Sequence, residues 1–158
     1  MKIKSFNKLV FSILVCQLAG IIGSVFTISS IENWYILLNK PFFSPPNWIF
    51  GPVWTILYTL MGISLYLVWT SKKGSNATDK AYTVFTAQLI LNTIWSIIFF
   101  GLRNPFLALI VIYIMLLAII LTLIQFRKIS ILSAKLLVPY LVWVSFASLL
   151  NLAIVVLN

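Results

Sequence analysis

Long apolar runs separated by short polar segments dominate the chain. The charged residues divide it into charge-free windows at 9–31, 41–71, 81–102, 104–126 and 136–158. A helix needs roughly 20 apolar residues to cross about 30 Å of hydrocarbon, so each window is long enough for one crossing. The pattern predicts an all-α integral membrane protein, a bundle of five transmembrane helices in a single domain over residues 1–158.

Capping and turn residues indicate where these helices begin and end. We expect helices at about 6–28, 49–70, 80–101, 105–126 and 132–156. Asn104 followed by Pro105 is typical of an N-cap and first-turn pair. Thr78 or Asp79 is expected to cap the third helix. Pro139 falls inside the fifth helix, where its missing amide should bend the backbone.

The segment before the second helix, residues 29–48, carries more unusual residues than a polar turn needs. Pro41, Pro45 and Pro46 have a fixed φ and no amide N–H, which disfavours helix and favours a stiff, extended path. A stiff segment of this kind can act as a lid. The second helix then has Pro52 in its first turn, where a missing amide costs nothing.

Charge supports the membrane assignment and predicts an orientation. Only 8% of the 158 residues are charged, whereas a soluble protein carries about 25%. Basic loops are retained in the cytoplasm. Lys40 and Arg103 fall on one side of the predicted membrane, and the remaining basic residues fall on the other: Lys2, Lys4, Lys8, Lys72, Lys73, Lys80, Arg127, Lys128 and Lys135. The N-terminus is therefore expected in the cytoplasm, with the first loop and C-terminus outside.

The net charge of +9 is thus explained by basic residues that set the orientation of the helices in the membrane. It gives no support to nucleic-acid binding. No targeting segment is evident, and this favours a bacterial plasma membrane. The single Cys16 permits no internal disulfide.

Few groups for acid–base or metal chemistry are available. The chain has no histidine, and its only carboxylates, Glu32 and Asp79, lie in predicted loops. This composition disfavours a metal site, a resident cofactor and general acid–base catalysis. Proton-coupled pumping is also disfavoured, because pumps place acidic residues or histidine inside the membrane.

Aromatic and amide residues at membrane depth form helical faces at spacings of three and four. These faces are Phe50, Trp54 and Tyr58; Asn92, Trp95 and Phe99; and Tyr140, Trp143, Ala147 and Asn151. Together they could line an apolar pocket under the lid, with a few hydrogen-bonding groups, suited to a flat hydrophobic ligand.

A purely structural role is the alternative for each of these residues. Trp54, Trp95 and Trp143 could be packing residues. Asn92 and Asn151 could simply join helices by hydrogen bonds. The remaining tryptophans fall at predicted interfaces, where the residue is usually an anchor: Trp34, Trp48 and Trp69.

Ordered motifs over nearly the whole chain resemble one known family. They are WY…L.KP…PP.W.FGPVW..LY..MG, then QL.LN..WS..FF, then PY..W.SFA..LN. These motifs are similar to those of the TspO/MBR family, the tryptophan-rich sensory proteins and translocator proteins that include the peripheral benzodiazepine receptor. The resemblance implies a five-helix bundle, often a homodimer, that binds porphyrins such as protoporphyrin IX and isoquinoline or benzodiazepine ligands beneath the first loop.

Carried over by motif position, the resemblance implies a set of ligand-binding residues: Tyr35, Pro45, Pro46, Trp54, Tyr58, Asn92, Trp95, Trp143, Ala147 and Asn151. It further implies that Trp54 and Trp143 take part in light- and oxygen-dependent porphyrin degradation. Sensing, transport of tetrapyrroles and such degradation all remain open functions. One feature departs from the animal members, because only LAIVVLN follows Asn151 and a cholesterol-recognition pattern is absent there.

Overall fold

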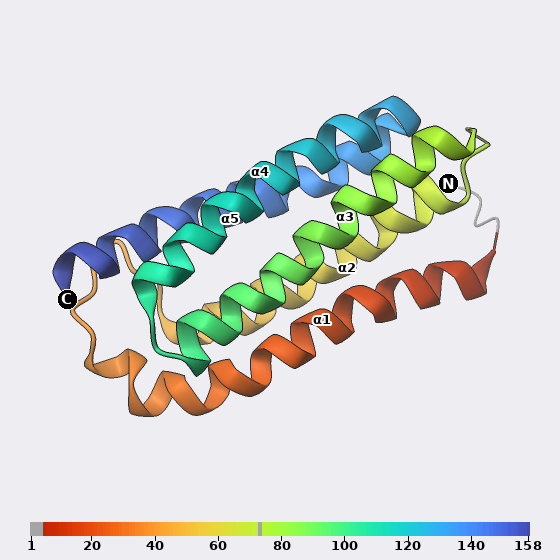
Figure 1. Cartoon of the computed structure of the whole chain (residues 1–158). Coiled ribbons are helices and arrows are strands. Elements are labelled where there is room, and N and C mark those ends of the chain that lie inside the picture. Colours follow the sequence, from red (N-terminus) through yellow and green to blue (C-terminus); the bar gives the residue numbers. More distant parts are fainter. Residues whose placement is uncertain (1–4, 73) are drawn as a thin grey trace.

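The computed structural model describes residues 5–72 and 74–158 and shows an elongated bundle of helices lying side by side (Figure 1). The long helices are α1 (Phe6–Asn33), α2 (Phe50–Trp69), α3 (Ser75–Ser96), α4 (Pro105–Ile129) and α5 (Ile131–Leu157). Short 3-10 turns, η1 (Tyr35–Leu37) and η2 (Asn47–Ile49), lie between α1 and α2, and a π-helical turn, η3 (Ile97–Gly101), extends α3.

All 5 long helices are long and apolar enough to cross a membrane, which confirms the expected all-α membrane architecture. Their apolar side chains are not confined to the core. α4 exposes Phe106, Tyr113 and Leu117, among others. In hydrocarbon such exposure is favourable, so only the interior of the bundle needs specific packing.

Some helices that are consecutive in the chain pack against each other, and others pack against more distant helices. α4 packs against both α3 and α5, while α1 lies along one edge of the bundle beside α2 and α3 (Figure 1). The central core includes a stacked pair, Phe85 of α3 and Phe126 of α4, with ring centroids 5.4 Å apart.

Small residues let the helices approach closely. A Cβ added at Gly62 of α2 would lie 2.5 Å from the Ile13 Cα of α1, so only glycine permits this contact. The hydroxyl oxygens of Ser64 in α2 and Ser133 in α5 lie 2.9 Å apart, and both residues are fully buried. Each hydroxyl also donates to the other residue's backbone carbonyl at 2.9 Å, which satisfies both groups inside the bundle.

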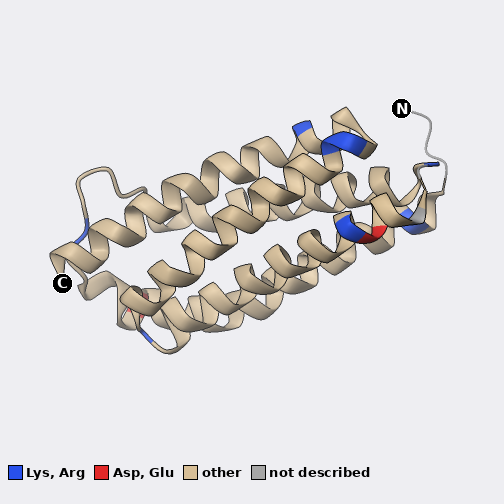
Figure 2. Ribbon diagram, turned by 45° about the horizontal axis from the view of Figure 1, so that its top comes forward, with Lys and Arg blue, Asp and Glu red and all other residues tan. Residues whose placement is uncertain are grey.

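Charged residues gather at the two ends of the bundle (Figure 2). Lys40 and Arg103 lie at one end, hereafter the lid end. The opposite end, hereafter the basic end, carries the basic residues at the start of α1 and around the α2–α3 and α4–α5 connections: Lys8, Lys72, Lys80, Arg127, Lys128 and Lys135. Lys2, Lys4 and Lys73, also expected there, lie outside the described residues.

Several expected helix boundaries differ from the structure; α4, for example, ends at Ile129 instead of near residue 126. α1 continues to Asn33 instead of ending near residue 28, because the Ser30 hydroxyl donates to the Phe100 carbonyl at 2.6 Å and holds the last turns against η3. Residues 29–33 therefore belong to α1 and not to the lid.

The cap expected for α3 at Thr78 or Asp79 is also wrong. The helix begins at Ser75, and its N-cap is Gly74 in an extended conformation. The connection between α2 and α3 is therefore shorter than expected from Thr78 and Asp79 as capping residues. The cap of α4 is confirmed, since Asn104 accepts a hydrogen bond from the Leu107 amide at 3.0 Å.

The close α1–α2 contact predicts an effect on stability. Gly62→Ala should lower the free energy of unfolding by about 1–3 kcal/mol, because the added methyl group meets the Ile13 backbone. Thermal or denaturant unfolding in detergent micelles, followed by circular dichroism, measures the change. Gly51→Ala is the matched control, since a Cβ at Gly51 meets nothing within 4 Å. Equal stability of the two variants would contradict this account of the contact.

Candidate ligand pocket

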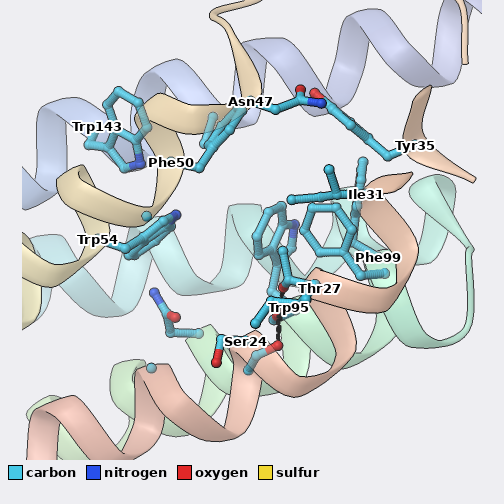
Figure 3. A pocket seen from close by; sticks show the side chains of 18 of the residues that line it. Ser24, Thr27, Ile31, Tyr35, Asn47, Phe50, Trp54, Trp95, Phe99 and Trp143 are labelled. Atoms are coloured by element: carbon cyan, nitrogen blue, oxygen red, sulfur yellow. Dashed lines mark hydrogen bonds between the residues drawn. The ribbon is translucent and has the colours of Figure 1, made fainter. Parts of the chain in front are cut away.

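A cavity of about 330 Å³ lies in the lid-end half of the bundle, between α1, α2, α3 and α5 and beneath η1 (Figure 3). Most of the residues expected from the sequence line it: Tyr35, Trp54, Tyr58, Asn92, Trp95, Trp143, Ala147 and Asn151. Pro45 and Pro46 are not part of the lining. Asn47, the residue that follows them, is.

The floor of the cavity is a buried hydrogen-bond network. The Tyr58 hydroxyl donates to Asn92 Oδ1 at 2.5 Å, and Asn92 Nδ2 donates to the Tyr140 hydroxyl at 3.0 Å. Tyr140 in turn donates to Met115 Sδ at 3.7 Å. Asn92 therefore joins α2, α3 and α5 and also lines the cavity, so its structural and pocket roles coincide.

The wall formed by α3 and α5 is fixed by a second amide. Trp95 Nε1 donates to Asn151 Oδ1 at 3.1 Å, and Asn151 Nδ2 donates to the Pro105 carbonyl at 2.9 Å. Trp95 also stacks on Phe99, with ring centroids 5.3 Å apart and planes 28° apart. These contacts hold a flat aromatic surface on one side of the cavity.

A second aromatic surface comes from α2 and α5 (Figure 3). Trp54 stacks on Tyr58 with ring centroids 5.5 Å apart, and Phe50 meets Trp143 edge-on at 6.1 Å. Trp143 Nε1 is buried and has no hydrogen-bond partner within the described structure. Unlike Trp95, Trp143 thus has an indole N–H that no group of the described structure accepts.

The π-helical turn η3 and the lid close the lid end. Tyr35 is 3% exposed and contacts the rings of Phe99 and Phe100, with centroids 6.2 and 5.8 Å away. Burial raises the pKa of the Tyr35 hydroxyl above its usual value, and a hydrogen bond with the Ser44 side chain offsets part of the rise. The Lys40 ammonium lies 4.5 Å from the centroid of the Tyr35 ring, a cation–π contact.

The lid is fastened to the end of α5. The Asn39 backbone N–H donates to Asn158 Oδ1 at 3.0 Å, and Asn158 Nδ2 donates back to the Asn39 backbone carbonyl at 3.0 Å. Asn39 Nδ2 also donates to the Leu157 carbonyl at 3.3 Å. This set of contacts is called the Asn39–Asn158 clasp below.

Sequence reasoning missed the contribution of α1. Residues of this helix form one side of the cavity, among them Gln17, Gly20, Ser24, Thr27 and Ile31. Apart from Gln17, they are small or aliphatic and resemble packing residues. The one available signal was the spacing of small residues, and it indicates close helix approach as readily as a pocket.

The structure thus defines a class, that of five-helix integral membrane proteins with an aromatic cavity inside the membrane-spanning bundle. The TspO/MBR family model matches residues 12–157, and the chain belongs to this family.

Known relatives cover most of the chain. It is 50% identical over 151 residues to the tryptophan-rich protein TspO of Archaeoglobus fulgidus, a match that covers 96% of this chain and 97% of the relative. It is 40% identical to the human translocator protein, covering 85% and 80% of the two chains. It is also 37% identical to the tryptophan-rich sensory protein of Cereibacter sphaeroides, covering 80% and 78%.

The floor network predicts a stability effect for Asn92→Leu. Removal of the amide leaves the buried Tyr58 hydroxyl unpaired, at a cost of about 1–3 kcal/mol. Tyr140 loses its Asn92 donor but still donates to Met115 Sδ. Unfolding in micelles measures the loss. Asn76→Leu, at an exposed position on the same helix, is the control and should change stability little. A loss of the same size in both variants would rule out the network as its cause.

Proposed function

We propose that the protein is a membrane receptor or sensor that binds porphyrins, protoporphyrin IX among them, and isoquinoline- or benzodiazepine-type ligands in the pocket under the lid. The observation that carries the proposal is the pairing of two aromatic surfaces across one cavity, with Trp143, whose buried indole N–H has no partner in the described structure, in its wall. Membership of the family and the names of two relatives, a sensory protein and a translocator protein, support it.

The aromatic surfaces favour a flat, conjugated ligand. Trp95 and Phe99 form one surface, and Trp54 and Trp143 contribute to the other, so a planar ring system can stack on both. Ligand sites of this type are mostly apolar, with a few polar groups that fix orientation. A carbonyl, carboxylate or ring nitrogen of the ligand would accept the hydrogen bond that Trp143 Nε1 can donate.

We further propose that the protein lies in a bacterial plasma membrane with its basic end in the cytoplasm. The concentration of described Lys and Arg residues at that end supports this orientation (Figure 2). The lid and the C-terminus then face outward. A homodimer follows from the family resemblance. Porphyrin is a ligand in this proposal and not a resident cofactor.

The donor of Trp143 gives a direct test. Trp143→Phe keeps an aromatic ring but removes the N–H, so it should weaken protoporphyrin IX binding about tenfold, the effect of roughly 1.4 kcal/mol from one lost hydrogen bond. Titration of the purified protein, followed by the Soret absorbance of the porphyrin, measures Kd. Trp69→Phe is the control, because Trp69 lies at the basic end and outside the lining.

Equal affinity of wild type and Trp143→Phe would exclude the indole donor. Failure of the wild-type protein to bind protoporphyrin IX at micromolar concentration would overturn the proposed function itself.

A further inference from the structure

We propose that the pocket is filled from the bilayer, through a lateral opening between the lid-end halves of α1 and α2. The natural occupant is then a molecule dissolved in the lipid, and acyl chains of lipids can enter the empty pocket. This inference deepens the proposed function, and one of its tests requires no porphyrin.

In its basic-end half, α1 is attached to α2. The Gln17 amide donates both to the Thr55 carbonyl and to Thr59 Oγ1 at 3.0 Å. Nearer the basic end, Gly62 lies against the Ile13 backbone. These contacts close the bundle between the two helices from the basic end up to the level of the pocket floor.

In its lid-end half, α1 leaves α2 and follows α3 and η3. Ser96 Oγ donates to the Gly23 carbonyl at 2.9 Å, and the Thr27 and Ser96 hydroxyl oxygens lie 2.9 Å apart. The Ser30 hydroxyl of α1 donates to the Phe100 carbonyl of η3. One turn beyond Gln17, Gly20 of α1 still lies against the Tyr58 ring of α2, where an added Cβ would clash with Tyr58 Cε2. From Gly20 to the lid end, no hydrogen bond or aromatic ring pair joins α1 to α2 within the described residues. The lid-end half of α1 is therefore held by α3 and η3 and not by hydrogen bonds to α2.

Exposed lining residues mark the opening that results. Ile21 and Ile28 of α1 line the pocket although they are 56% and 69% exposed. Gly51 and Thr55 of α2 line it from the other side and are also exposed. Each of these residues lies within a membrane-spanning helix, so the opening faces hydrocarbon.

The route from the water side is closed. Tyr35, in the first turn of the lid, is only 3% exposed, and the Asn39–Asn158 clasp ties the lid to α5. The cavity of about 330 Å³ also falls at the lower end of the roughly 300–1,000 Å³ typical of small-molecule sites. A tetrapyrrole would therefore extend through the lateral opening.

The first experiment compares the two routes kinetically. Gly51→Phe adds bulk to the opening, where a Cβ meets nothing within 4 Å, and Ile56→Phe adds it on an exposed position of α2 outside the lining. Asn39→Cys with Asn158→Cys, in a Cys16→Ser background, locks the lid by a disulfide. Protoporphyrin IX is delivered from preloaded liposomes to proteoliposomes, and its transfer is followed by stopped-flow quenching of tryptophan fluorescence.

Lateral entry predicts that Gly51→Phe slows loading about tenfold or more. Ile56→Phe and the oxidised lid variant should load within about twofold of their controls, wild type and the reduced double-cysteine protein. Loading that is slowed by the locked lid and unaffected by Gly51→Phe would overturn the proposal. Loading that is slow in no variant would also overturn it.

The second experiment uses lipid alone. Brominated acyl chains quench tryptophans that they contact, and Trp54 and Trp95 both line the pocket. Lateral access predicts that the quenched fraction falls in Gly51→Phe and not in Ile56→Phe. An unchanged fraction in Gly51→Phe would overturn the opening. Absence of porphyrin binding in the wild type, with this lipid result intact, would overturn only the proposed function.

An independent observation concerns the other half of the bundle. Gln88 is 1% exposed and lies one helical turn from Asn92 toward the basic end. Neither its Oε1 nor its Nε2 has a hydrogen-bond partner within the described structure. Asn92 and Asn151, the other buried amides of the bundle, are bonded through both side-chain atoms.

We infer that Gln88 binds internal water. A buried amide without any partner is strongly unfavourable, and buried waters typically bond to about three such groups. The water would extend the polar floor of the pocket into the basic-end half of the bundle.

Nuclear magnetic resonance in micelles tests this site directly. The side-chain amide protons of Gln88 should show cross-relaxation with a long-lived water, assigned by their loss in Gln88→Met. That variant should leave Tm unchanged or lower, because the water loses a partner. A dry site would show no water signal, and Gln88→Met would then raise Tm. Either of those results would overturn the inference.

Discussion

The hydrogen bonds of Asn92 are the constraint on which the rest of the bundle depends. Hydrocarbon offers an amide no hydrogen-bonding partner, so Asn92 must find its partners within the bundle. Tyr58 and Tyr140 supply them and thereby fix α2, α3 and α5 at one depth. Toward the basic end the bundle is packed with apolar side chains. Toward the lid end, the same three helices separate enough to leave the cavity.

Much of this arrangement could be predicted from the sequence, for a physical reason. Charged residues are excluded from hydrocarbon, so the charge-free windows mark the spans, and the spacing of Trp54, Asn92 and Trp143 on their helices places them on inward faces. The features that could not be predicted depend on contacts between helices. The length of α1 depends on the bond from Ser30 to Phe100, which no local pattern indicates. Gly20 lies against the Tyr58 ring of α2, and the spacing of small residues on α1 indicates such a close approach without showing that the same residues line a pocket.

The pocket and its cover form one mechanical unit through α5. This helix carries Trp143, Ala147 and Asn151 along one face, and its last residues hold the lid through the clasp. A ligand that moved the α5 wall would therefore strain the lid directly. Such coupling between an occupied pocket and an external surface is what a sensor requires, because a partner outside the membrane can contact only the surface.

The clasp also affects how the protein can be handled in the laboratory. Asn158 uses both atoms of its side-chain amide, on Asn39 and on the Ile154 carbonyl. An affinity tag, fluorophore or fusion partner joined directly after Asn158 would crowd the point where the lid is held. The same addition before α1 would lie at the opposite end of the bundle. The choice of terminus for purification thus decides whether ligand-binding data report on a closed or a disturbed lid.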